Sequence, residues 1–175
     1  RLRDVPPSGR SVFEPAVLER VLEEVGRWPV KPFLKITGGE PLVEAGLTID
    51  TLERAARLGL VTKLSTNGVL LADAAVARRV IRSGLDYLSV SVDGPPDVHD
   101  GIRGRARTYA AALEGIRNVR RLRRAEARRP PMILISVVVS ALNQDRLYET
   151  ARLMEEAGVD WLNFQFMNFT TPAAT

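Results

Sequence analysis

Short runs of β-branched and apolar residues alternate along the chain with segments of helical periodicity. Five runs predict strands, at residues 33–37, 61–66, 87–93, 132–139 and 161–167. Apolar residues at helical spacing predict helices before and between them, at residues 15–26, 50–58, 72–83, 108–127 and 144–157. Strict alternation of this kind predicts an α/β fold with parallel strands joined by right-handed helical crossovers.

Within each predicted strand, apolar and polar residues fall on opposite faces. In the third strand, Leu88, Val90 and Val92 share one face, and Ser89 and Ser91 share the other. A doubly wound sheet is apolar on both faces, and a closed eight-stranded barrel fills its interior with branched apolar side chains. A polar inner face under an apolar outer one therefore predicts an open or splayed barrel, with room inside for solvent or a ligand.

Polar residues also gather where the strands end. In parallel α/β folds, ligands bind at the C-terminal ends of the strands. These ends read TGGEP at 37–41, STNG at 65–68, SVDG at 91–94, SALN at 140–143 and QFMN at 165–168. In the first, two glycines allow a close approach to a ligand, and Pro41 fixes the backbone beside Glu40. Five polar ends at one edge predict a binding site.

Composition limits the class of protein. The 175 residues suffice for one domain with a substantial core, and 45% hydrophobic with 26% charged residues is typical of a soluble globular protein. No apolar run approaches the ~20 residues of a membrane span, and no signal peptide is evident, so we expect a cytoplasmic protein without a membrane partner. There is no cysteine and one histidine, which excludes disulfides, thiolate nucleophiles and a thiolate-held or His-rich metal site within the chain.

Four segments together resemble the radical S-adenosylmethionine superfamily, in particular its Gly-Gly-Glu-Pro branch. They are KITGGEPLV, KLSTNGVLL, YLSVSVDGPPDVHDGIRG and ISVVVSALNQD, and the resemblance covers residues 11–167. It implies a parallel partial (βα)6 barrel. It also implies a 4Fe–4S cluster and S-adenosylmethionine, which together generate a 5′-deoxyadenosyl radical that abstracts hydrogen from an organic substrate, either a peptide or a cofactor precursor.

The resemblance assigns the cofactor site residue by residue. The Gly38-Gly39-Glu40-Pro41 corner would receive the amino group of S-adenosylmethionine, because freed carbonyls and a carboxylate suit an ammonium group. The remaining cofactor residues would lie at the following strand ends: Ser65 and Asn67 at the second, Ser91 and Asp93 facing the ribose or carboxylate, and Asn143 near the fifth strand. Asn143 is also a predicted N-cap of the last helix.

Four further residues are candidates for substrate binding. Lys35 and Lys63 point into the predicted barrel, where they could attract an anionic substrate or balance Asp93. His99 is predicted in a loop with Arg103 close by, where it could perform acid–base chemistry or order its neighbours through hydrogen bonds. No catalytic residue can be assigned from the sequence.

The chain departs from the family in one respect. The family holds its cluster with three cysteines in a Cys-x-x-x-Cys-x-x-Cys loop, and this chain has none. We therefore expect a barrel that lacks its first strand and last helix. Residues 1–10 would be a loop following the cluster-binding segment of a longer parent, and residues 11–175 the barrel core, inactive when isolated. The resemblance also allows an additional iron–sulfur domain in that parent.

Three other functions stay open. The first is a non-catalytic barrel-like module that binds a nucleotide-like ligand or a protein partner. The second is a (βα)8-type enzyme using Lys35 or Lys63 as a Schiff-base catalyst. The third is nucleic-acid binding through the Arg-rich segment 117–129, but no aromatic residues interleave there for base stacking, so an exposed helix end is the favoured interpretation.

Overall fold

The computed structural model describes residues 14–127 and 130–166. Five parallel strands form one sheet in the order β1-β2-β3-β4-β5. They are β1 (Phe33–Ile36), β2 (Val61–Thr66), β3 (Tyr87–Ser91), β4 (Met132–Val139) and β5 (Trp161–Phe166). Strands adjacent in the chain are adjacent in the sheet, so right-handed crossovers place the connecting helices on one face. This topology confirms the predicted parallel α/β fold of the partial-barrel type.

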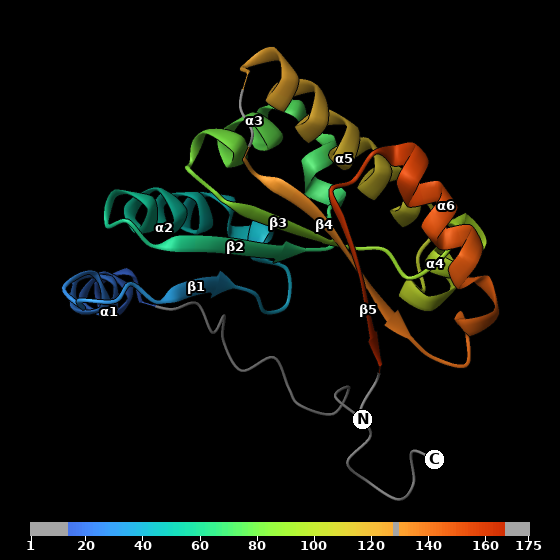
Figure 1. The fold of residues 1–175 in the computed structure, drawn as a ribbon, viewed down its shortest axis with the longest axis horizontal. Helices are drawn as coiled ribbons and strands as arrows, with labels where there is room; N and C mark the ends of the chain where they lie inside the picture. Colours follow the sequence, from blue (N-terminus) through green and yellow to red (C-terminus); the bar gives the residue numbers. More distant parts are fainter. Residues whose placement is uncertain (1–13, 128–129, 167–175) are drawn as a thin grey trace, which may run out of the picture.

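Figure 1 shows α2, α3, α5 and α6 along one side of the sheet, while the other side carries no described helix. The helices are α1 (Pro15–Gly26), α2 (Ala45–Arg57), α3 (Ala74–Arg82), α4 (Pro96–Arg103), α5 (Thr108–Ala125) and α6 (Leu147–Ala157). Three short 3-10 segments precede helices: η2 (Pro41–Glu44), η3 (Val69–Ala72) and η4 (Gln144–Arg146). The predicted leading loop, residues 1–10, and Met167 lie outside the described residues.

Several element boundaries differ from the prediction. The helix expected at 50–58 begins at Ala45, because η2 runs directly into it after Pro41. The helix expected at 144–157 is divided into η4 and α6. The short helix α4 was not predicted at all, since its eight residues include a proline and a glycine that suggest a turn.

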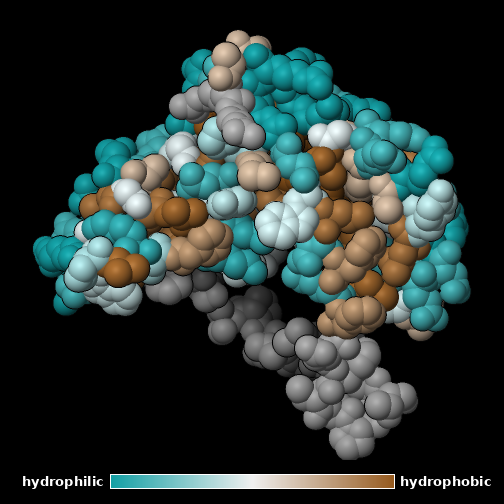
Figure 2. Space-filling view, viewed as in Figure 1, coloured by the Kyte–Doolittle hydropathy of each residue, from teal (hydrophilic) through white to brown (hydrophobic). Residues whose placement is uncertain are grey.

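The core lies between the helices and the apolar face of the sheet. Leu64, Leu88, Val90 and Ile135 are fully buried there, as the alternation predicted. The expectation is wrong for β5, where Phe164 and Phe166 keep 39% and 77% of their surface exposed. In the described structure β5 is an edge strand and is less fully covered by helices, and Figure 2 shows apolar side chains on the surface over this side of the sheet.

Two aspartates tie the beginnings of neighbouring strands together. Asp86, directly before β3, accepts hydrogen bonds from the backbone N–H of Thr62 at 2.8 Å and from its hydroxyl at 3.1 Å. Asp160, directly before β5, accepts from the backbone N–H of Ile133 at 2.8 Å. Each satisfies polar groups that would otherwise be left at a strand start.

Two arginines of the Arg-rich segment 117–129 make contacts that stabilise the fold. Arg123 pairs with Asp160 and donates to the carbonyl of Pro131, and Arg120 donates to the carbonyl of Ala157. These contacts tie the end of α5 to the loops beside β4 and β5. Within the ranges described, no helix is both long and apolar enough to cross a bilayer.

Candidate functional site

The Gly-Gly-Glu corner follows β1 directly and presents its backbone. Gly38 has φ of 145°, a conformation that side chains disfavour, and both Gly38 and Gly39 are exposed. Added β-carbons would meet no atom within 4 Å, so the space beside both glycines is open. Among the described residues, none donates a hydrogen bond to either glycine carbonyl. The corner therefore offers two free acceptors to a ligand.

Glu40 is held rigidly by the end of the next strand. Its Oε1 accepts from the hydroxyl of Thr66 at 2.6 Å and from the N–H of Leu42 at 3.1 Å, and its Oε2 accepts from the N–H of Asn67 at 2.7 Å. The carboxylate caps η2 and joins the ends of β1 and β2. Its first role is thus to position the corner, while its negative charge lies beside the glycine carbonyls.

The end of β2 forms the second part of the site. Asn67 accepts at Oδ1 from the N–H of Val69 at 2.9 Å, and Gly68 adopts a φ of 78°. This turn packs closely on α5, because a β-carbon on Gly115 would lie 2.6 Å from the Gly68 carbonyl oxygen. Ser65 lies on the polar face of β2, opposite the face that carries Thr66, and is half-buried. The structure thus brings the predicted residues of the first two strand ends together.

Asp93 is buried at the third strand end and is already paired. Its Oδ2 lies 2.7 Å from Nη2 of Arg103, and its Oδ1 accepts from the N–H of Val138 at 3.3 Å. Only 4% of the Asp93 side chain is exposed, against 34% for Arg103. Arg103, rather than a lysine, balances this carboxylate. Half-buried Ser91 remains the more accessible polar group of this strand.

His99 lies in helix α4 and not in a loop, which corrects the sequence prediction. Its Nδ1 accepts a hydrogen bond from the N–H of Asp93 at 3.0 Å, and the side chain is 2% exposed. Burial lowers the pKa of His99 and the Arg103 guanidinium lowers it further, while Asp93 and Asp100 partly oppose the shift. The neutral ring therefore orders the end of β3, in agreement with the expectation that His99 orders its neighbours through hydrogen bonds.

Asn143 is also a structural tie, and its predicted capping role is wrong. Its side chain makes no capping bond to the following helical turn. The amide nitrogen donates to the carbonyls of Asp93 at 2.7 Å and Val138 at 2.8 Å, and Oδ1 accepts from the N–H of Ser140 at 2.8 Å. Both amide protons are used within the protein, and the residue is 1% exposed. It fixes the ends of β3 and β4 against each other.

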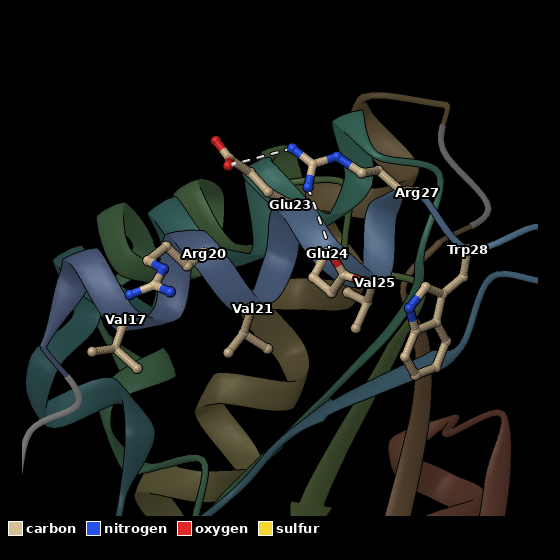
Figure 3. A pocket seen from close by; sticks show the side chains of 8 residues that line it. All are labelled: Val17, Arg20, Val21, Glu23, Glu24, Val25, Arg27 and Trp28. Atoms are coloured by element: carbon tan, nitrogen blue, oxygen red, sulfur yellow. Dashed lines mark ion pairs between the residues drawn. The ribbon is translucent and has the colours of Figure 1, made fainter.

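We call these strand ends, residues 38–41, 65–68, 91–94 and 140–143, the rim. A concavity of about 360 Å³ opens beside it, lined in part by Glu40, Asn67, His99 and Arg103. A larger hollow of about 710 Å³ lies along the outer side of α1, where Figure 3 shows Val17, Val21, Val25 and Trp28 beside the Arg27 ion pairs. That hollow contains no predicted site residue.

Lys35 and Lys63 lie within β1 and β2, three residues before Gly38 and two residues before Ser65 of the rim. They are register partners on β1 and β2 and line a concavity of about 530 Å³ on the polar face of the sheet. Burial lowers the pKa of Lys63, and the neighbouring Lys35 ammonium lowers it further. Within the described part of the chain neither lysine has an acidic partner. The predicted balance between these lysines and Asp93 is wrong.

Sequence reasoning missed Thr66 and the aromatic residues beside the lysines. Thr66 holds Glu40, but it lies on the apolar face of β2, and only its neighbours Ser65 and Asn67 were assigned to the site. Tyr87 and Trp161 share the lysine concavity. Each stands at the first position of a strand, on the parity of the polar face, and that was the available signal.

The described residues contain no group of three His, Cys, Asp or Glu side chains that could hold a metal ion. The 175 residues contain no cysteine. The residues present therefore do not fit a thiolate-held 4Fe–4S cluster. The free carbonyls of Gly38 and Gly39 beside an ionisable carboxylate do fit an ammonium group.

Comparison with known proteins identifies the family of the chain. A family model described as "Radical SAM superfamily" matches residues 7–153. The chain is 34% identical over 145 residues to pre-heme d1 synthase of Dinoroseobacter shibae, covering 83% of this chain and 33% of that protein. It is 34% identical over 117 residues to GTP 3′,8-cyclase of Petrotoga mobilis, covering 65% and 33%. The chain thus spans about a third of the length of these relatives.

Solved structures share the fold. The structure described as native anSMEcpe with bound AdoMet superposes with a TM-score of 0.70 at 17% sequence identity, over 91% of this chain and 44% of that one. The same protein with bound AdoMet and Kp18Cys peptide gives 0.61 at 18% identity, over 87% and 41%. At these identities the likeness establishes the partial-barrel architecture.

Proposed function

The chain belongs to the radical SAM superfamily, and from this premise we propose that it is the cofactor- and substrate-binding barrel core of a radical S-adenosylmethionine enzyme. In this family S-adenosylmethionine supplies the radical that removes a hydrogen atom from the substrate. The chain covers only part of its relatives' length, so the proposal concerns the enzyme of which these residues form the core.

The observation that carries the proposal is the pair of carbonyls at Gly38 and Gly39, to which no described residue donates a hydrogen bond. An ammonium group carries three donors and is bound well by carbonyl and carboxylate oxygens. Glu40 adds a negative charge beside these acceptors, and its three internal hydrogen bonds prevent it from moving away. The corner would thus bind the amino group of the cofactor in one orientation.

The other predicted cofactor residues divide into two groups. Ser65 and Ser91 are half-buried on the polar face and could touch the ligand directly. Asp93 and Asn143 already use their polar atoms within the protein. We therefore assign Asp93, Arg103, His99 and Asn143 to positioning, since their contacts hold the ends of β3 and β4 in place.

The names of the relatives suggest the substrate class. They include pre-heme d1 synthase, Fe-coproporphyrin III synthase and GTP 3′,8-cyclase, whose names point to small organic molecules. One structural neighbour was solved with a peptide. We propose a cofactor precursor as the substrate class of this chain, with a peptide as the alternative.

Direct binding of S-adenosylmethionine tests the cofactor site. Glu40→Ala removes the charge and releases the corner, so we expect binding to weaken by about 1.5–3 kcal/mol, as for loss of a charged hydrogen bond. Asp50→Ala, which removes an exposed carboxylate from α2, serves as the matched control and should change nothing. Isothermal titration calorimetry gives both values. A wild-type protein without affinity, or equal affinity in wild type and Glu40→Ala, would contradict the proposal.

A second candidate is a non-catalytic module that binds a nucleotide-like ligand through the same corner, and a natural protein without cluster cysteines would favour it. The two functions differ in whether cluster thiolates exist elsewhere in the natural protein. Anaerobic reconstitution of that protein with iron and sulfide distinguishes them: a cluster absorption supports the enzyme, and a colourless protein that still binds S-adenosylmethionine supports the module.

A further inference from the structure

The polar face of the sheet contains a second feature besides the rim. A concavity of about 530 Å³ lies near the strand starts, where Lys35 and Lys63 stand side by side. Its walls include Phe33, Tyr87 and Trp161, and Asn163 contributes an amide. Lys31 also lines it, but its ammonium group donates to the carbonyl of Gly26. We call Lys35, Lys63, Phe33, Tyr87, Trp161 and Asn163 the floor.

The two lysines form a positive centre with no acidic partner among residues 14–127 and 130–166. They occupy the same register position on adjacent parallel strands, and like charges directly opposite each other destabilise a sheet. Lys63 is partly buried, and burial, followed by the charge of Lys35, lowers its pKa. An anion placed between the two ammonium groups would relieve this repulsion.

The walls of the concavity suit a flat apolar group. The rings of Phe33 and Tyr87 lie with centroids 6.1 Å apart, tilted by 50°, on either side of β2. Trp161 is 56% exposed, and Leu134 is buried at its register partner position on β4. Exposed aromatic surface beside paired cations is the usual chemistry for an aromatic acid.

From this arrangement we propose that the floor binds an organic anion with a flat apolar body, its carboxylate or phosphate lying between Lys35 and Lys63. The proposal rests on the function proposed above and deepens it, since this ligand would be the substrate. From Lys63 to Asn67 the chain advances four residues, or about 13 Å along an extended strand. An elongated substrate anchored at the floor would therefore present its other end to the cofactor at the rim.

Fluorescence of Trp161 can report binding. The chain has two tryptophans, so Trp28→Phe leaves Trp161 as the sole tryptophan, which can be excited selectively over tyrosine. The probes are biphenyl-4-carboxylate, biphenyl-4-yl phosphate and the neutral biphenyl-4-methanol, which share one aromatic body. We expect either anion to bind about tenfold or more tightly than the alcohol, the scale of a charged hydrogen bond. The stronger of the two anions identifies the chemistry of the anionic group.

Variants then locate the charge. Lys35→Met with Lys63→Met should abolish the preference for anions and leave the affinity for the alcohol unchanged, whereas Arg152→Met, on the exposed side of α6, should keep the preference. Added salt gives a further test in protein that keeps both lysines. Because salt screens charge, it should weaken the binding of the two anions and leave the binding of the alcohol unchanged. Equal binding of acid and alcohol, a preference that survives the double substitution, or no binding of either anion would overturn the proposal. Because these probes bind without S-adenosylmethionine, failure here is distinguishable from failure of the cofactor site.

Discussion

The rim and the floor share the open face of one sheet, but the charged side chains of the rim are paired or hydrogen-bonded within the protein, whereas those of the floor have no such partner among the described residues. At the rim, Glu40 accepts three internal hydrogen bonds and Asp93 is paired with Arg103. At the floor, Lys35 and Lys63 face each other without an acidic partner in the described structure. The charged side chains of the rim are thus already bonded before any ligand binds. The acceptors left for a ligand are backbone carbonyls. The floor retains an electrostatic cost that a ligand can remove.

The largest expected effect concerns the paired charge of the rim. Arg103→Met leaves the Asp93 carboxylate buried without its cation, and breaking a fully buried pair costs about 3–5 kcal/mol. Because Arg103 is 34% exposed, we expect a smaller loss of about 2 kcal/mol in the free energy of unfolding. Urea denaturation measures it, with Arg105→Met as the neighbouring exposed control. Equal stability of the two variants would show that Asp93 does not depend on this partner.

An intermediate effect is expected from the single histidine. Its pKa is lowered from 6.5 in the folded protein, and its Nδ1 must stay unprotonated to accept from Asp93 N–H. As the pH falls through 6.5, the unfolded chain takes up a proton that the folded chain excludes. The free energy of unfolding should therefore decrease as the pH is lowered, by up to about 1.4 kcal/mol per pH unit, and should level off below the pKa of His99 in the folded protein.

His99→Gln isolates this contribution, since it keeps a polar side chain and removes the titration. The difference between wild type and variant should depend on pH in this window, while the contributions of the carboxylates cancel. A difference that stays constant from neutral to mildly acidic pH would mean that His99 titrates alike in the folded and unfolded states.

The smallest effect has the opposite sign and concerns the floor. Lys63→Met removes the repulsion with Lys35 and adds an apolar side chain near Phe33 and Tyr87. We expect the free energy of unfolding to rise by about 0.5 kcal/mol, with a smaller gain at high salt. Arg78→Met, which removes an exposed cation of α3 that makes no ion pair among the described residues, should give no gain. Destabilisation by Lys63→Met would indicate that Lys63 has a favourable partner in the free protein.

The sequence predicted the fold better than it predicted the contacts of the site. Alternating periodicity identified all five strands, and the polar parity of residues such as Ser65 and Ser91 identified the open face. Local patterns cannot show which group a polar side chain will meet across the sheet. Asn143 therefore looked like a helix cap, although it bonds to the carbonyl of Asp93, fifty residues away.

The same limit applies to the charges. Lys35 and Asp93 looked like partners because both lie on the polar face, but Asp93 follows the end of β3, whereas the lysines lie within β1 and β2. The short helix α4 instead brings Arg103 back to Asp93. A helix of eight residues with proline at its start carries too weak a periodicity to be predicted.

The central claim, that the rim is the S-adenosylmethionine site, is tested most directly by residue-resolved NMR. Adding the cofactor to ¹⁵N-labelled protein should shift the backbone amides of Gly38, Gly39, Glu40, Asn67 and Ser91. The amides of Lys35, Lys63 and Trp161 should respond instead to biphenyl-4-carboxylate. Cofactor-dependent shifts confined to the floor, or absent from residues 38–41, would contradict the account.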